Sequence, residues 1–270
     1  MSDDEFSLEG GLFAEPEDFR PPPPEAHFVK YERKYCTDES KHNITEINLR
    51  LIGSSPLWGH LLWNAGIYTG DFIEKNYEKY IKNRYVLEFG SASALPCLLS
   101  SLNNAKKVIS TDYPDPELIN NIQYNIDHLG YPPAKDIIKP EGFIWGNSTE
   151  DISLLLKENN GKADFLIMSD LVFNHSEHKK LLKSCKELIK PLNNGNPRSG
   201  GKCLVVFSPH RPHLLENDLN FFKTAEEEFN FDVELVEMIH WHVPMFPEDY
   251  TIESEEIRKR IYCYLLHPTW

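Results

Sequence analysis

Two acidic residues next to short apolar runs give this chain its clearest chemical signal. The run 85–89 carries Glu88 and is followed at once by Gly90 and by small residues. This pattern predicts a strand, a tight turn and the start of a helix, with bare backbone at the turn for a ligand to approach. About twenty residues later a second β-rich run ends in Asp112, whose carboxylate can accept hydrogen bonds from both hydroxyls of a ribose. The chain is therefore predicted to bind a nucleoside-bearing cofactor.

The residues after the first strand distinguish between such cofactors. A dinucleotide fingerprint needs three glycines, but only Gly90 is in place, and Ala92 and Leu95 hold the other two positions. NAD or FAD therefore fits poorly, because a pyrophosphate needs close approach of the backbone. S-adenosylmethionine has no phosphate and tolerates Ser91 and Ala92. We predict S-adenosylmethionine as the cofactor, which argues against an NAD-dependent oxidoreductase.

Length and charge narrow the function classes. A chain of 270 residues with 40% hydrophobic residues fits one globular domain with a tail. The net charge of −14 disfavours nucleic acid and suits a basic partner, such as a lysine-rich protein tail. No apolar run is long enough to span a membrane, and the acidic first residues do not resemble a secretory signal, so we expect a cytoplasmic protein. We also expect it to be a monomer. The five scattered cysteines fit reduced thiols, and no metal site is predicted.

The N-terminal residues differ in composition from the rest of the chain. Residues 1–35 form an acidic, proline-rich arm with four consecutive prolines at 21–24, and residues 36–270 form the predicted catalytic domain. One interpretation is a solubilising tail. The other uses the aromatic residues Phe6, Phe13 and Phe19, which suit an arm that closes over the acceptor. Composition leaves both open.

Strand and helix patterns alternate through the domain. This alternation predicts an α/β fold with a mostly parallel sheet and helices on both faces. Two final strand-like runs with no helix between them predict a hairpin, and hence one antiparallel strand. Strands are expected near 44–51, 84–89, 106–111, 140–145, 163–169, 202–208, 233–239 and 260–266, and helices near 57–65, 67–81, 94–103, 116–129, 150–158, 176–190 and 212–229.

Ligands of an open parallel sheet bind at the carboxyl ends of its strands, so residues there should converge on one site. Ser169 and Asp170 end one predicted strand, and Trp145 ends another. Trp145 could flank an adenine ring or anchor the core. Asp170 and Phe173 could line the place where a group is transferred, whereas Asp170 could instead cap the following helix.

Four segments together carry a family resemblance. They are 58–66 (Trp-Gly-His-Leu-Leu-Trp-Asn-Ala-Gly), 88–96, 110–116 and 169–175. The chain resembles the seven-strand class I methyltransferases, which are Rossmann-like, and within them the family-16 lysine methyltransferase group. Ala92 and Ala94 depart from glycines that are common in the wider family. The resemblance implies cofactor contacts at Trp63, Gly90, Ser91, Ala92, Asp112, Trp145 and Ser169, and it places the group's Asp-x-x-Tyr/Phe motif on Asp170 and Phe173.

The same resemblance implies a substrate. It is strongest to fungal members that use S-adenosylmethionine to methylate the N-terminal α-amine and the adjacent lysine of translation elongation factor 1-alpha. An amine must lose its proton before it attacks a methyl group, and we expect Asp170 to orient the ammonium.

The alternative is a small-molecule N-methyltransferase with a nicotinamide-like acceptor, which would need an enclosed pocket. A non-catalytic scaffold would leave Asp112, Ser169 and Asp170 without a reason to be together.

Overall fold

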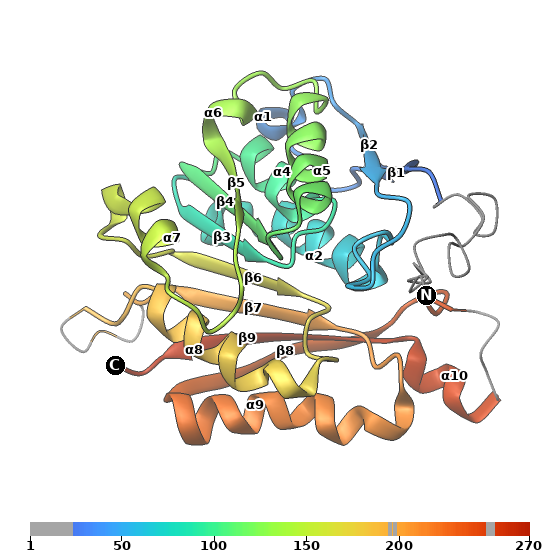
Figure 1. The fold of residues 1–270 in the computed structure, drawn as a ribbon, viewed down its shortest axis with the longest axis vertical. Coiled ribbons are helices and arrows are strands. Elements are labelled where there is room, and N and C mark those ends of the chain that lie inside the picture. The colour runs from blue at the N-terminus through green and yellow to red at the C-terminus, as the bar shows by residue number, and fades with distance from the viewer. Residues whose placement is uncertain (1–23, 194–195, 197–198, 247–251) are drawn as a thin grey trace, which may run out of the picture.

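A seven-stranded sheet forms the centre of the domain (Figure 1). The computed structural model describes residues 24–193, 196, 199–246 and 252–270. The strand order is β5-β4-β3-β6-β7-β9-β8, and β9 runs antiparallel to both of its neighbours while the other pairs are parallel. The strands are β3 (Tyr85–Phe89), β4 (Lys107–Asp112), β5 (Ile138–Gly142), β6 (Phe165–Ser169), β7 (Lys202–Phe207), β8 (Phe231–His240) and β9 (Arg260–Pro268). The predicted fold class is confirmed.

The central strands are apolar because helices cover both of their faces. All five residues of β3 are buried, and so are four of the five in β6. One buried cluster joins the sheet to α2, α4 and α5, and a second joins it to α7, α8 and α9 on the other face (Figure 1). The covering helices are α2 (Asn64–Lys75), α4 (Leu95–Leu102), α5 (Pro116–Asp127), α7 (Glu150–Leu155), α8 (His178–Leu188) and α9 (Leu215–Phe229), and the shorter helices are α1 (Asp38–Lys41), α3 (Tyr77–Tyr80), α6 (Ala134–Ile137) and α10 (Ile252–Arg258).

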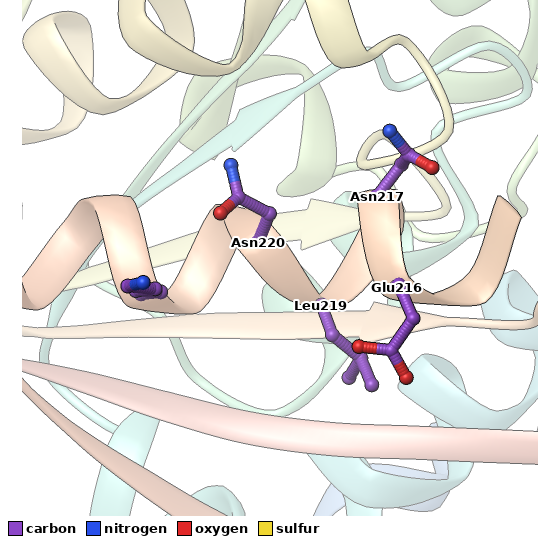
Figure 2. A pocket seen from close by; sticks show the side chains of 5 residues that line it. Glu216, Asn217, Leu219 and Asn220 are labelled. Carbon is purple, nitrogen blue, oxygen red and sulfur yellow. The ribbon is translucent and has the colours of Figure 1, made fainter.

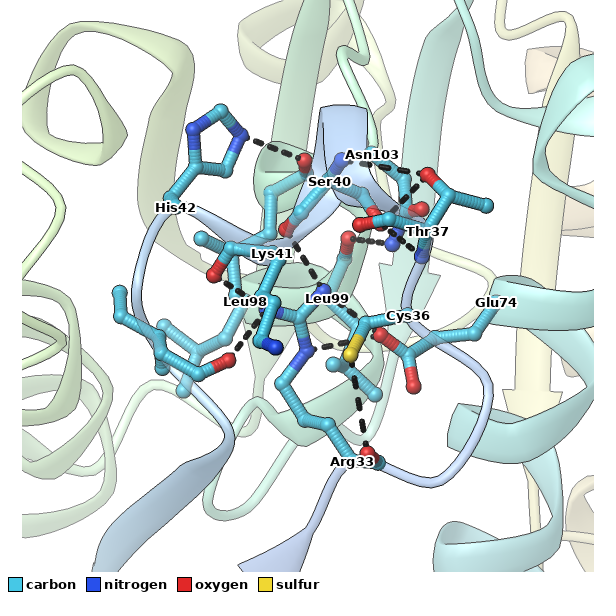
Figure 3. Close-up of polar contacts among 12 residues, drawn as sticks. Arg33, Cys36, Thr37, Ser40, Lys41, His42, Glu74, Leu98, Leu99 and Asn103 are labelled. Carbon is cyan, nitrogen blue, oxygen red and sulfur yellow. Dashed lines mark hydrogen bonds and ion pairs between the residues drawn. The ribbon is translucent and has the colours of Figure 1, made fainter.

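A separate two-stranded sheet packs beside α2. It is formed by β1 (His27–Glu32) and β2 (Glu46–Leu51), which run antiparallel. Just after β1, Arg33 forms an ion pair of 2.7 Å with Glu74 of α2, and both side chains are fully buried. Arg33 also donates to the backbone carbonyls of residues 40, 41 and 44 (Figure 3). A buried guanidinium needs this many acceptors, because its loss of water is otherwise uncompensated.

The structure differs from the sequence prediction in four places. Residues 27–32, placed in the N-terminal arm, form β1; the part of the arm from residue 1 to 23 lies outside the described residues. The helix expected at 57–65 is wrong, since this segment is a series of turns and α2 begins at Asn64. The strand expected at 140–145 ends at Gly142, so Trp145 lies in a loop. A short helix, α10, stands between the last two strands.

Candidate active site at the carboxyl ends of the strands

The turn after β3 is built around Gly90. Its backbone has φ +59°, and a Cβ here would lie 2.6 Å from Leu171 Cδ2. Such a left-handed conformation favours glycine. The next two residues connect this turn to the end of β4. Ser91 N donates to Thr111 O at 2.9 Å, and Ala92 N donates to Asp112 Oδ2 at 2.7 Å. Two predicted cofactor residues are thus held at the end of β4, and one of them, Ala92, bonds directly to a third, Asp112.

Asp112 is fixed by backbone donors on both of its oxygens. Besides the bond from Ala92, Tyr113 N donates to Oδ1 at 2.7 Å. Burial raises the pKa of Asp112, and these two N–H groups oppose the rise. Each carboxylate oxygen has more than one lone pair, so each can still accept a ligand hydroxyl. The arrangement fits a ribose, as the sequence predicts.

Glu88 lies below the turn and is 1% exposed. Burial raises its pKa to about 8, and the nearby Cys97 and Ser91 only partly oppose this rise. Among the described residues, Glu88 Oε2, Ser91 Oγ and Ser110 Oγ are buried and have no hydrogen-bond partner. Such orphaned polar atoms beside this turn fit a site that a polar ligand or water completes.

Asp170 follows the last residue of β6, and its hydrogen bonds connect this point to the end of β7 and to the segment after it. Its backbone has φ +60°, and its N–H donates to Val206 O at 2.7 Å. Its carboxylate accepts from Ser208 N at 3.2 Å and contacts His210 Nε2 at 2.8 Å. The alternative of a helix cap does not fit, because these partners belong to the segment after β7. The site also includes a histidine that the sequence analysis did not assign.

An aromatic group surrounds His210. The Trp63 ring lies 4.8 Å from the His210 ring, and the Phe246 ring lies 5.7 Å from Trp63 and 6.2 Å from His210. Trp58 adds a third aromatic side chain, 6.3 Å from Trp63, and is 46% exposed. We call Trp58, Trp63 and Phe246 the aromatic cluster. Aromatic faces attract cations, so the cluster suits an ammonium group.

Ser169 and Phe173 are held from two sides of the site. Ser169 Oγ lies 3.1 Å from Thr69 Oγ1 on α2, six residues after Trp63. The backbone carbonyl of Phe173 accepts from Arg211 at 2.7 Å. The predicted residues at the end of β6 are thus brought together with α2 and with the segment after β7.

Trp145 is positioned by a different set of contacts. Phe143 N donates to Asp112 O at 2.7 Å, so the loop leaves β5 beside Asp112. The loop then packs on α8, where Gly146 N donates to Ser184 Oγ at 2.8 Å. Trp145 is half-buried against the second core cluster and lines a hollow of about 430 Å³ with α8 residues. These contacts fit the interpretation of Trp145 as an anchor of the core. A contact of Trp145 with adenine stays a prediction.

Other surface features do not carry this chemistry. A hollow of about 440 Å³ lies over α9, and Figure 2 shows that its lining side chains project from this one helix. Within the described ranges, no three histidine, cysteine or acidic side chains gather as metal ligands would. None of the helices in that part of the chain is long and apolar enough to cross a membrane.

Sequence reasoning missed His210, Thr69 and Phe246. His210 had one usable signal, since it follows a predicted strand end by a few residues, as ligand-binding residues of such sheets often do. Thr69 sits inside a helix, and Phe246 is far from any motif. Only the packing of α2 and of residues 241–246 against the sheet brings these two residues to the site.

A sheet of this strand order, with a glycine turn after β3 and an acid at the end of β4, is the fold of the class I methyltransferases. PH1948 from Pyrococcus horikoshii, described as a putative RNA methyltransferase, shares the fold with a TM-score of 0.53 at 16% identity, covering 82% of this chain and 91% of its own. The chain belongs to the lysine methyltransferase family, because its residues 47–228 match the sequence pattern of that family. The predicted enzyme class, a methyltransferase, is confirmed.

Relatives within the family match the whole chain. A Debaryomyces hansenii protein named protein N-terminal and lysine N-methyltransferase EFM7 is 51% identical over 274 residues, covering 100% of both chains. A Candida albicans protein of the same name is 47% identical over 279 residues, again covering 100% of both. Similarity therefore extends beyond the family core into both ends of this chain.

Proposed function

We propose that this chain uses S-adenosylmethionine to methylate the N-terminal α-amine and the adjacent lysine of translation elongation factor 1-alpha. One observation carries the choice of acceptor: the chain is similar along its full length to relatives named for N-terminal and lysine methylation. The elongation factor itself is proposed from the resemblance of the motifs at 58–66, 88–96, 110–116 and 169–175. We also propose a cytoplasmic monomer.

The residues at the turn suit the proposed cofactor. Asp112 would hold the ribose hydroxyls, and the backbone at Gly90 and Ser91 would lie along the rest of the nucleoside. Trp63, Ser169 and Trp145 are the further proposed contacts. Bound S-adenosylmethionine would supply an electrophilic methyl group: a bond from the amine nitrogen to this carbon forms while the carbon–sulfur bond breaks and sulfur keeps the electron pair.

The protein side of the reaction consists of orientation and removal of a proton. The acceptor reaches the site as an ammonium, and the aromatic cluster offers it faces that bind a cation and exclude water. Most of the acceleration would then come from holding the amine in line with the methyl group. The negative charge of the chain favours the approach of a basic N-terminal segment.

The test is methylation of the purified elongation factor. Factor made in bacteria, with its N-terminus free and unmethylated, is incubated with the enzyme and S-adenosylmethionine. Mass spectrometry of the N-terminal peptide should show methyl groups on the α-amine and on the adjacent lysine. Transfer to nicotinamide in a parallel reaction would instead favour the small-molecule alternative.

Two altered substrates act as controls. A factor with an acetylated N-terminus should receive methyl groups on the lysine alone, and a factor with arginine at that lysine should receive them on the α-amine alone. A factor that stays unmodified at both amines, beside an enzyme that binds S-adenosylmethionine, would refute the proposed substrate.

A further inference from the structure

We propose that His210 is the base that takes the proton from the acceptor ammonium, and that Asp170 positions it. This rests on the proposed function and deepens it. The sequence analysis gave the direct contact with the ammonium to Asp170. In the structure, both oxygens of this carboxylate are already engaged, one by Ser208 N and the other by His210. The side chain of Asp170 is also 4% exposed against 14% for His210, so an incoming amine meets the imidazole more readily than the carboxylate.

The Asp170 contact decides which ring nitrogen can act as a base. A carboxylate only accepts hydrogen bonds. Nε2 of His210 must therefore carry a proton and donate it across the 2.8 Å contact. The neutral ring then has its lone pair on Nδ1, for which the part of the chain that the structure describes provides no hydrogen-bond partner. His210 thus has the tautomer of a general base, oriented by an acid as in hydrolase triads.

The environment of His210 is that of an acceptor site. Its side chain is 14% exposed, and that of Asp170 is 4% exposed, so the pair is shielded and yet reachable. The aromatic cluster surrounds the ring at distances between 4.8 and 6.2 Å for Trp63 and Phe246. The same side chains that would bind an ammonium by its charge therefore bring it next to a proton acceptor.

The pair also lies next to the proposed methyl donor site. Leu171 follows Asp170 directly and packs over Gly90, where an added Cβ would be 2.6 Å from Leu171 Cδ2. Ser169 precedes Asp170 and is among the predicted cofactor contacts. The residue that binds His210 is therefore flanked in the sequence by a residue that packs on the turn and by a predicted cofactor contact.

Charges around the ring keep it basic. Burial is the largest single influence and acts to lower the pKa of His210, but the acidic groups around the ring, Asp170 above all, together raise the net pKa. Asp218 of α9 adds to the rise, and Arg258 of α10 opposes it. In the proposed step, the ammonium N–H bond breaks and the proton moves to Nδ1, which gives a neutral amine and an imidazolium stabilised by Asp170. The imidazolium returns the proton to solvent after transfer.

The first test measures the pairing without any substrate. The imidazole of His210 is titrated by NMR in the native enzyme and in Asp170→Asn, without cofactor. We expect its pKa to fall in the variant, because a neutral amide no longer favours the imidazolium. An unchanged titration would overturn the assigned role of Asp170.

The second test measures the base itself. His210→Gln should lower kcat about 100-fold or more while the Kd for S-adenosylmethionine changes less than about twofold. In His210→Ala, added imidazole should restore part of the rate, which a purely structural histidine would not allow. His213→Gln, which alters an exposed histidine further along the same segment, should leave kcat unchanged. Normal turnover by His210→Gln, or a folded His210→Ala that imidazole does not rescue, would overturn the proposal.

A mixture of cell proteins serves as the acceptor, so that the role of His210 can be tested even if the proposed substrate is wrong. Methyl groups from labelled S-adenosylmethionine are counted on all proteins of an extract from cells that lack the gene. If the native enzyme labels a protein other than the elongation factor, the proposed substrate is wrong, and the effect of His210 can still be measured on the protein that is labelled.

Discussion

Replacing Glu88 by glutamine should make the protein more stable at pH 8 and change the pH dependence of its stability. Glu88 is fully buried, and its pKa is raised from 4.5 to about 8 by burial. The folded protein therefore holds this group neutral, while the unfolded chain ionises it above pH 4.5. The stabilising effect of the proton is fully present below pH 4.5 and is lost as the pH rises toward 8.

The size of the effect follows from this window. Each pH unit between the two pKa values changes the free energy of unfolding by about 1.4 kcal/mol. Between pH 5 and pH 8 the native protein should therefore lose about 4 kcal/mol relative to Glu88→Gln, whose amide does not titrate. Partial hydration of the carboxylate on local opening would reduce this value, so it is an upper figure.

Urea unfolding of the two proteins at pH 5, 6, 7 and 8, without cofactor, measures this difference. The control is Glu226→Gln, which alters an exposed acid on α9. This variant should change the free energy of unfolding by the same small amount at every pH. Surface substitutions of this kind usually change stability by no more than about 0.5 kcal/mol. If the difference between the native protein and Glu88→Gln varies no more than that of the control over this range, Glu88 is ionised in the fold. The explanation by burial would then be wrong.

Three further predictions concern the cofactor turn and the arm. Asp112→Ala should weaken S-adenosylmethionine binding by about 1.5–3 kcal/mol through the loss of charge-assisted hydrogen bonds; calorimetry that shows native affinity in a folded variant would rule out this role. Gly90→Ala should cost at least about 1–2 kcal/mol of stability, because of its left-handed φ and the clash with Leu171, and a native melting temperature would contradict it. Deletion of residues 1–20 should keep cofactor affinity and lower methyl transfer, because it removes Phe6, Phe13 and Phe19, the aromatic residues expected to close over the acceptor. Full activity of the truncated enzyme on the protein substrate would leave the arm a tail.

The fold was largely predictable because its signals are local. β3, β6 and β7 are short apolar runs between amphipathic helices, and such alternation leaves few other arrangements. The errors arise where the chain is held by distant partners. Residues 57–65 are rich in apolar side chains and suggest a helix, but Trp58 has φ +63° and Trp63 packs on His210 and Phe246 instead.

The site was predictable only in part for the same reason. Gly90 and Asp112 lie at the ends of recognisable strands, so their meeting follows from the parallel sheet. The contact of Asp170 with His210 spans 40 residues and depends on the path of the chain after β7. The position of Phe246 depends on the segment after β8, whose Val243 carbonyl accepts from Asn64 at 2.9 Å. No periodicity in the sequence encodes such contacts.

The buried pair of Arg33 and Glu74 has a consequence for synthesis on the ribosome. The strands β1 and β2 leave the ribosome early, but the carboxylate that neutralises Arg33 follows 41 residues later. Until α2 is made, Arg33 has no acidic partner to bury with and must stay in water, so the small sheet can only close once α2 docks. The final packing of the first-made strands must therefore wait for a later segment of the chain.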